Sequence, residues 1–351
     1  MTATDLPAKP NTNLYNAPFD VPVNASVNAS VEASINNPSA GNSRLDDSFV
    51  VIDWHAPWLC HLNQLGYISH AITQLSGLKN EPAQTDIIEN TPDIIAKVLN
   101  TALQQQADDL QQSLSQTKPA LNNQAQTLRF VSQNALPAGE AYESFIGTTG
   151  NIPTRNNLHD LFNGSIWLTF PKTKALLNYY HMLEIEQQGI GASRGRVRDT
   201  ITVFDENGAI LVTAEPSIGE ALVDFDWQKS LVEPREQWDK PKALNSASQA
   251  AVYIFGHALI EKLLQPRKAL CAHSIVIYVT PDFFALSLSE RISHLDQKVA
   301  DCMEALLSQP DVTPRKLSPL PILGVPHFWA ENAKPNFYDD SQVFRSGRRQ
   351  K

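Results

Sequence analysis

Apolar residues recur at helical spacing through residues 154–171, which read TRNNLHDLFNGSIWLTFP. At about 100° per residue, one face collects the apolar side chains Leu158, Leu161, Phe162, Ile166 and Leu168. Asn156 or Asn157 stands before this face, where a short side-chain oxygen accepts the free backbone N–H groups of a first helical turn. The pattern predicts a capped core helix that ends at Phe170, because Pro171 disfavours helix at the preceding residue.

The same period predicts helices along much of the remaining chain. The expected helices lie over 59–78, 92–114, 171–188, 247–264 and 288–308, with a helical turn over 139–146. Two of them begin at a capping-box spacing, Ser246 to Gln249 and Ser287 to Glu290, in which each side chain caps the other residue's backbone N–H. Gly256 falls inside the helix expected over 247–264, where the lack of a side chain permits another backbone to approach closely.

Other segments have the composition of strands. Residues 274–280, SIVIYVT, predict a buried central strand, and residues 130–131 predict a short one. In residues 200–213, TITVFDENGAILVT, two β-rich runs flank Asn207 and Gly208. Asn-Gly is the pair preferred in a type I′ turn, because both positions need positive φ. We therefore expect a β-hairpin over 200–213.

Together these elements predict an α+β fold, with several helices packed on a small, largely antiparallel sheet. Residues 46–345 are expected to form a single globular domain. Residues 1–45 are rich in Asn, Ser, Ala and Pro and contain the repeats VNAS, VNAS and VEAS, so they bury too little apolar surface to offset the entropy of ordering. We expect a disordered tail there, and a basic frayed tail over 346–351.

Charge and cysteine content narrow the classes of function. A net charge of -9 argues against binding to nucleic acid or anionic membranes, because phosphate affinity rests on Lys and Arg. The three cysteines are too widely spaced for a disulfide framework or a cysteine zinc site, and they favour a reducing, cytoplasmic location. We expect neither a signal peptide nor a membrane span, which needs roughly 18 consecutive apolar residues. The pattern leaves the oligomeric state open.

Several motifs together resemble a known family. They are LPAGEAYESFIGTTGNIPTRNNLHDLFNGSIWLTFPKTK, RDTITVFDENGAIL, FGHALIEKLLQPRKALCAH and FYDDSQVFR. In this order and spacing they are similar to the bacterial domain-of-unknown-function family 3025, and the likeness covers roughly residues 47–345. The resemblance implies a shared fold and supplies no activity, so the chemistry is read from the residues.

Polar residues on the predicted helices form a candidate site. The candidate catalytic residues are His159, Asp160, Asn163, His257 and Glu261, and the candidate substrate-binding residues are Arg198 and Lys268. These candidates include two pairs, His159 with Asn163 and His257 with Glu261, that have the four-residue spacing which brings side chains together on a helix. A carboxylate fixes the tautomer of a neighbouring histidine, and an arginine fork binds a carboxylate or phosphate.

Each candidate also has a structural interpretation. His159 and Asn163 would then bridge neighbouring loops, and His257 with Glu261 would be an ordinary helix pair. Asp205 and Glu206 are interpreted as a solvated turn beside the expected hairpin tip.

Two hypotheses about function remain. In the first, the chain is an enzyme acting on a small molecule, and a metal-assisted hydrolase is the favoured form, because histidines with carboxylates are ligands for a divalent metal such as zinc, iron or manganese. It requires His159 and His257 to converge. In the second, the chain is a non-catalytic binding protein whose polar residues form a buried network. The sequence lacks G-x-S-x-G, GxxxxGK[ST] and GxGxxG, which disfavours lipase-type hydrolases, P-loop NTPases and Rossmann dehydrogenases.

Overall fold

A four-stranded sheet lies at the centre of the structure, a computed structural model that describes residues 52–65, 67–77, 93–114, 128–188 and 195–347. Its strands, in the order β4-β3-β5-β6, are β4 (Ala250–Ile254), β3 (Gly208–Thr213), β5 (Cys271–Tyr278) and β6 (Ser318–Pro321). β3 and β5 are parallel, and the other two pairs are antiparallel. The expected α+β fold with a small, largely antiparallel sheet is confirmed, as is a central strand at residues 274–280.

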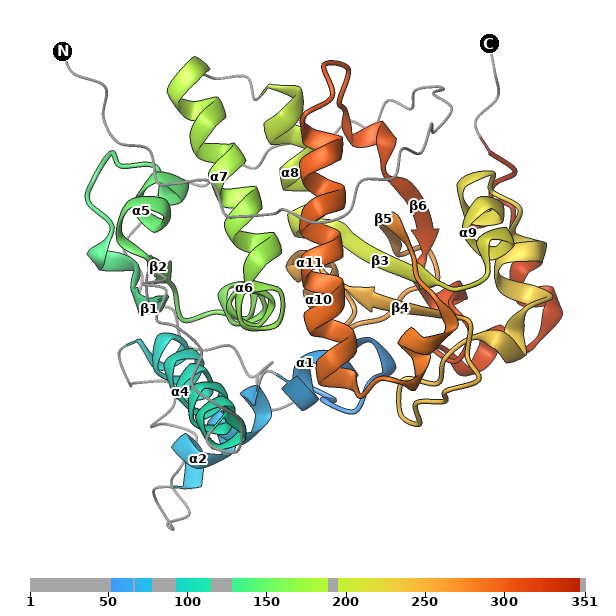
Figure 1. Cartoon of the computed structure of the whole chain (residues 1–351), viewed down its shortest axis with the longest axis horizontal. Coiled ribbons are helices and arrows are strands. Elements are labelled where there is room, and N and C mark those ends of the chain that lie inside the picture. Colours follow the sequence, from blue (N-terminus) through green and yellow to red (C-terminus); the bar gives the residue numbers. More distant parts are fainter. Residues whose placement is uncertain (1–51, 66, 78–92, 115–127, 189–194, 348–351) are drawn as a thin grey trace.

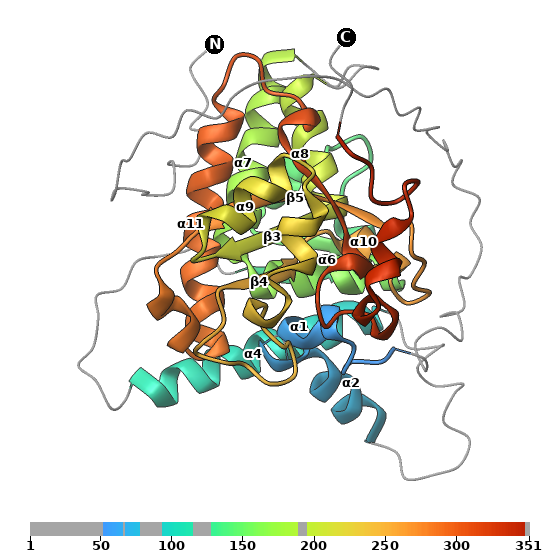
Figure 2. The same ribbon diagram turned by 90° about the vertical axis from the view of Figure 1, so that its right-hand side faces the viewer.

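Helices surround this sheet (Figure 1). They are α6 (Leu158–Thr169), α7 (Pro171–Gln188), α8 (Arg196–Asn207), α9 (Pro216–Val223), α10 (His257–Lys262) and α11 (Leu288–Leu307). α7 and α11 pack against each other, and Figure 2 shows α11 and α10 on opposite sides of the sheet. The helices expected over 154–171, 171–188 and 288–308 correspond to α6, α7 and α11.

The earlier part of the chain adds a second group of elements. It contains α1 (Cys60–Leu65), α2 (Ile68–Gly77), α4 (Ile94–Leu114), β1 (Arg129–Ser132), α5 (Tyr142–Thr149) and β2 (Asn151–Thr154). β1 and β2 pair in parallel, and α2 packs on α4. Gly150 ends α5 with φ 71°, a left-handed conformation that favours glycine.

Helix α6 is packed on both sides, which explains its apolar sequence. Phe162 and Ile166 belong to the hydrophobic core around the sheet, whereas Leu161 and Trp167 belong to a second core with α4. The close packing requires Gly164, since a Cβ there would lie 2.3 Å from a methyl carbon of Leu99. Helix α6 therefore joins the two cores and is held firmly between them.

Side-chain caps fix the ends of two helices. The amide oxygen of Asn157 accepts a hydrogen bond from the backbone N–H of Asp160 at 2.8 Å, which confirms Asn157 as the cap of α6. At α11, Ser287 and Glu290 form the complete capping box that the sequence predicts.

Residues 196–213 correct the expected hairpin. The first run forms helix α8, and only the second forms a strand, β3. Ile201 and Phe204 lie at helical spacing and are fully buried, so packing of this helical face overrides the local turn preference. Gly208 has φ -73°, so no type I′ turn is formed. The glycine instead allows a tight junction, because a Cβ there would lie 2.2 Å from the backbone oxygen of Phe204.

The helix expected over 247–264 is also corrected. Residues 250–254 form β4, whose five side chains are all buried, and helix α10 begins only at His257. The sequence pattern of a short apolar run does not distinguish a buried strand from a helix. Residues 250–254 form a strand because they pair with β3. Close approach at Gly256 is confirmed, since a Cβ there would lie 2.4 Å from the backbone nitrogen of Gly208.

Some expectations lie outside the described residues. The disordered tail over 1–45 and most of the frayed tail over 346–351 are in this group. A single domain over 46–345 and a cytoplasmic location stay predictions. Within the residues that the structure describes, no helix has the length and apolar character needed to cross a membrane.

Candidate functional site

A polar cavity of about 450 Å³ opens among α5, α6, α7, α8 and the start of α10. Its volume lies in the range of small-molecule sites. Leu136 is the one aliphatic residue in its lining, which otherwise consists of Gln133, Tyr142, Glu143, Arg155, His159, Asp160, Asn163, His181, Arg198, Thr202, Asp205, Glu206 and His257. Most of the predicted site residues therefore lie in one cavity.

Two histidines from distant parts of the sequence meet at the cavity wall. The Nε2 atoms of His159, on α6, and His257, on α10, are 3.0 Å apart, and their rings are nearly perpendicular at 84°. His159 Nδ1 lies 3.2 Å from a carboxylate oxygen of Glu261. The convergence that the enzyme hypothesis requires is present.

The partners of the two rings define their tautomers. An ionised Glu261 only accepts hydrogen bonds, so the Nδ1–H of His159 donates to it, and in a neutral His159 ring the Nε2 keeps a lone pair. The Nε2–H of His257 then donates to His159. In this arrangement His257 Nδ1 is unprotonated. The atom is buried beside Asp205, and no backbone or side-chain group in the described part of the chain has the geometry of a hydrogen bond to it.

Burial keeps His257 neutral. Its side chain is 6% exposed, and burial lowers the pKa of His257 to about 4, against the opposing influence of the Asp205 carboxylate. An oxygen of Asp205 lies 3.8 Å from His257 Nδ1, too far for a hydrogen bond. The pKa of Glu261 is also lowered, mainly because its carboxylate accepts the hydrogen bond from His159. Both residues therefore hold the forms that the tautomers require at neutral pH.

A buried lysine holds Asp205 in place. Lys174 of α7, with 6% of its side chain exposed, contacts Asp205 at 2.6 Å. Burial by itself would raise the pKa of Asp205, but the charge of Lys174 and the hydrogen bond that Lys174 donates outweigh this effect and leave the pKa below its usual value. Lys174 also donates to the amide oxygen of Asn163 at 2.9 Å, and Asn163 donates to the hydroxyl of Tyr142 at 3.3 Å. Asn163 therefore positions Lys174. Within the described part of the chain, Asn163 forms no hydrogen bond to either histidine.

Asp160 is occupied by an arginine. Its two carboxylate oxygens accept hydrogen bonds from the guanidinium of Arg155, the shorter at 2.8 Å, and one oxygen also accepts from the backbone N–H of Arg155 at 2.6 Å. Asp160 was expected to be catalytic. That role stays a prediction. In the structure Asp160 braces the entry to α6, where Arg155 pairs with its carboxylate.

A contact between two glycines brings Asp205 and His257 together. The backbone N–H groups of Phe255 and Gly256 both donate to the carbonyl of Gly208, at 3.0 and 2.8 Å. The ring of Phe255 stacks on Phe204 with centroids 4.8 Å apart. The end of α8 and the start of α10 are therefore locked to each other one residue before His257.

Thr202 and Asp205 of α8, and Lys174 and His181 of α7, were not predicted as site residues from the sequence, whereas Arg198 was. Arg198, Thr202 and Asp205 follow one another at intervals of four and three residues, so one face of α8 lines the cavity. This spacing was available in the sequence, but the expected hairpin concealed it and made Asp205 a turn residue. Lys174 and His181 of α7 gave no comparable signal, because only the fold brings α7 to this place.

Another candidate lies elsewhere. Lys268 forms an ion pair with Asp340 at 3.1 Å and lies over the ring of Phe337, so it holds residues 337–340 against the rest of the fold. Lys268 does not line the cavity. Its assignment to substrate binding stays a prediction, which this cavity does not support.

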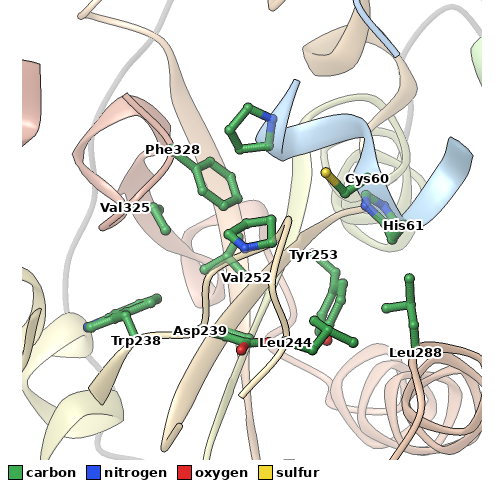
Figure 3. A pocket seen from close by; sticks show the side chains of 13 residues that line it. Cys60, His61, Trp238, Asp239, Leu244, Val252, Tyr253, Leu288, Val325 and Phe328 are labelled. Carbon is green, nitrogen blue, oxygen red and sulfur yellow. The ribbon is translucent and has the colours of Figure 1, made fainter. Parts of the chain in front are cut away.

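A second, much smaller void of about 20 Å³ lies between α1, β4 and the C-terminal segment (Figure 3). His61 and Tyr253 border it, and His61 Nε2 donates to the carbonyl of Ile254 at 2.9 Å. Burial lowers the pKa of His61 to about 4. This space holds about one water molecule and is a packing feature of the core.

Metal ligands are not grouped at the cavity in the way a metal-assisted hydrolase requires. Among the residues that the structure describes, no three or more His, Cys, Asp or Glu side chains are arranged to hold a metal ion. The two facing Nε2 atoms of His159 and His257 are a pair of potential ligands without a third. A divalent metal therefore stays a prediction from the sequence.

These features define an α+β protein with a polar cavity built around a histidine pair. The chain belongs to the family described as "Protein of unknown function (DUF3025)", whose sequence model matches residues 128–348. The match includes every residue of the cavity lining. Comparison with curated proteins and with solved structures gives no significant match.

Proposed function

We propose that this protein is an enzyme, of the hydrolase class, in which the histidine pair removes a proton from a water molecule beside a small molecule bound in the cavity. The observation that carries the proposal is the continuous line from Glu261 through His159 to His257, with contacts of 3.2 and 3.0 Å. A carboxylate, a histidine and a base in hydrogen-bond contact are the arrangement that general base catalysis needs.

His257 is the base in this proposal, and His159 with Glu261 are its positioning residues. His257 Nδ1 is occluded in this structure, so a water must first enter beside Asp205. His257 Nδ1 then accepts a proton from that water, and the proton on His257 Nε2 passes to His159 Nε2 across 3.0 Å. His257 is then neutral again, and the positive charge rests on His159. That charge faces Glu261, and 37% of the His159 side chain is exposed to solvent, so its cost is far lower than inside the core. The relay thereby offsets the burial that makes His257 alone a weak base.

Asp205 and Lys174 orient the base. Asp205 faces the Nδ1 side of His257, and its carboxylate favours the arrival of a proton there. Lys174 keeps Asp205 ionised and fixed. The alternative function is binding without catalysis, with the same residues acting as a buried network. The metal-assisted form of the enzyme differs from both, because His159 and His257 would then serve as metal ligands, and the metal would activate the water.

Conversion of a small molecule distinguishes the enzyme from the binding protein. Purified full-length protein is incubated with a protein-free extract of small molecules, and all components are followed by mass spectrometry over time. We expect at least one component to disappear and its products, heavier in sum by one water, to accumulate. His257→Gln should abolish this change, whereas the exposed His55→Gln should leave it intact.

Two results would count against a histidine-dependent enzyme. One is a component that the wild-type protein retains but never converts, which favours the binding protein. The other is conversion that survives in His257→Gln, which would place the chemistry elsewhere.

A further inference from the structure

Arg198 is the cavity residue whose bonding is least complete. Its Nε atom is buried, and within the described part of the chain the guanidinium has no recorded hydrogen bond or ion pair. Five buried side-chain nitrogen or oxygen atoms in that part have no partner, and three of them, on His181, Arg198 and His257, belong to residues of this one cavity. Buried polar groups are nearly always paired with protein or with ordered water, so this concentration marks the part of the cavity that is suited to a polar ligand.

The other cations at the site are already neutralised. Arg155 is paired with Asp160 at 2.8 Å, and Lys174 is paired with Asp205 at 2.6 Å. Arg198 therefore supplies the one cationic side chain of the lining that is left for a ligand. An unpaired guanidinium presents a planar fork that matches a carboxylate or a phosphate.

The other carboxylates of the cavity indicate whether the ligand carries a carboxylate or a phosphate. Glu143 and Glu206 also line the cavity. A dianionic phosphate at Arg198 would meet their negative charge with only one cation to balance it, whereas a carboxylate carries a single charge. The balance of charges therefore favours a monoanion.

Resting on the proposed function, we infer that the substrate carries a carboxylate group, which Arg198 binds at the end of the cavity away from the histidine pair. Arg198 and Asp205 are seven residues apart on α8, which separates them by about 10 Å along the helix axis. Asp205 adjoins His257, so the carboxylate and the bond that reacts lie in different parts of the substrate. His181 supplies a second polar contact, because its Nδ1 is also unpartnered.

The buried Nε–H of Arg198 is a direct reporter of this binding. In ¹⁵N-labelled full-length protein its signal is followed while hexanoate, benzoate or inorganic phosphate is added under mildly alkaline conditions, with ionic strength held constant by chloride. Hexanamide and benzamide serve as uncharged matches. We expect a saturable shift with a carboxylate, none with the amides, and weaker binding of phosphate. Arg198→Gln should weaken carboxylate binding by about tenfold or more, as expected for a hydrogen bond to a charged group.

The exposed Arg196→Gln is the control, since it removes the same charge two residues away. Equal responses to carboxylates and amides, no saturable response, or tighter binding of phosphate would each overturn the inference. Failure here is distinct from failure of the proposed function. A histidine-dependent substrate without a carboxylate would refute only the Arg198 site, and carboxylate binding without turnover would refute only the enzyme.

Discussion

His159 and His257 are 98 residues apart in the sequence, yet their Nε2 atoms lie 3.0 Å from each other at the wall of a polar cavity. The first ring is held by Glu261 and the second faces Asp205. This relationship makes each histidine dependent on the other, and it leads to predictions about both activity and folding.

The two histidines should behave as one unit in catalysis. We expect His257→Gln to lower the rate of the histidine-dependent conversion by about 10²–10⁴, the usual contribution of a general base. His159→Gln should cost a similar factor, and the double variant should be little worse than either, because the relay is already broken. Single-turnover rates of the three variants measure this. Independent, multiplying effects would show that the rings do not share a proton.

Lys174 should be essential for stability. Lys174→Met leaves the carboxylate of Asp205 without its buried partner, and we expect the free energy of unfolding to fall by about 3–5 kcal/mol. Adding Asp205→Asn should recover part of the loss. Lys229→Met removes a lysine from an exposed pair with Asp226 and should change stability little. Denaturant unfolding compares the variants, and equal losses for the two lysines would contradict this role.

Gly256 should tolerate no side chain. In Gly256→Ala the new Cβ would meet the backbone nitrogen of Gly208 at 2.4 Å, and backbone cannot move aside as a flexible side chain does. We expect a loss of about 1–3 kcal/mol in the free energy of unfolding, together with loss of turnover, because the strain displaces His257. Gly139→Ala offers a contrast, since nothing lies within 4 Å and only its φ of 85° opposes the change. Full activity in Gly256→Ala would mean that the glycine contact does not position the base.

Stability should decrease as the pH falls below about 6.5. Burial lowers the pKa values of His257 and His61 to about 4, so between about pH 6.5 and pH 4 the unfolded chain binds protons on these residues that the folded chain does not. Each histidine can therefore remove up to about 3 kcal/mol of stability across this window. Below it, the lowered pKa values of Asp205 and Glu261 act in the same direction.

The free energy of unfolding, measured by denaturant at several pH values, tests this dependence. His257→Gln should have a shallower slope than the wild type, because one titrating group is gone. The exposed His55→Gln should keep the wild-type slope. Identical slopes in all three proteins would show that His257 is not held neutral by the fold.

Sequence periodicity was sufficient to predict a helix where the helix is amphipathic or capped. Asn157, Ser287 and Glu290 marked helix starts that the structure confirms, because caps act through bonds within a few residues. It failed at Asn207-Gly208, where a local turn signal competes with the burial of Phe204 in the core. The outcome there depends on contacts between distant segments, which a local pattern does not contain.

The candidate site divides in the same way. His159, Asn163, His257 and Glu261 were found because helical spacing made them visible in pairs. The contact between His159 and His257 depends on the packing of α6 against α10, and these two helices are distant in the sequence. Lys174 was missed because its role comes entirely from burial beside Asp205. Asp160 was assigned to catalysis because the sequence does not show that Arg155 occupies its carboxylate.

¹⁵N NMR of the imidazole nitrogens in the wild-type protein at neutral pH shows whether His257 is a neutral base held by His159 and Glu261. We expect an unprotonated Nδ1 and a protonated Nε2 on His257, with a protonated Nδ1 on His159. Elemental analysis of the same sample records any bound metal. A proton on His257 Nδ1 with none on His159 Nδ1, or both Nε2 atoms unprotonated with stoichiometric metal present, would contradict this expectation.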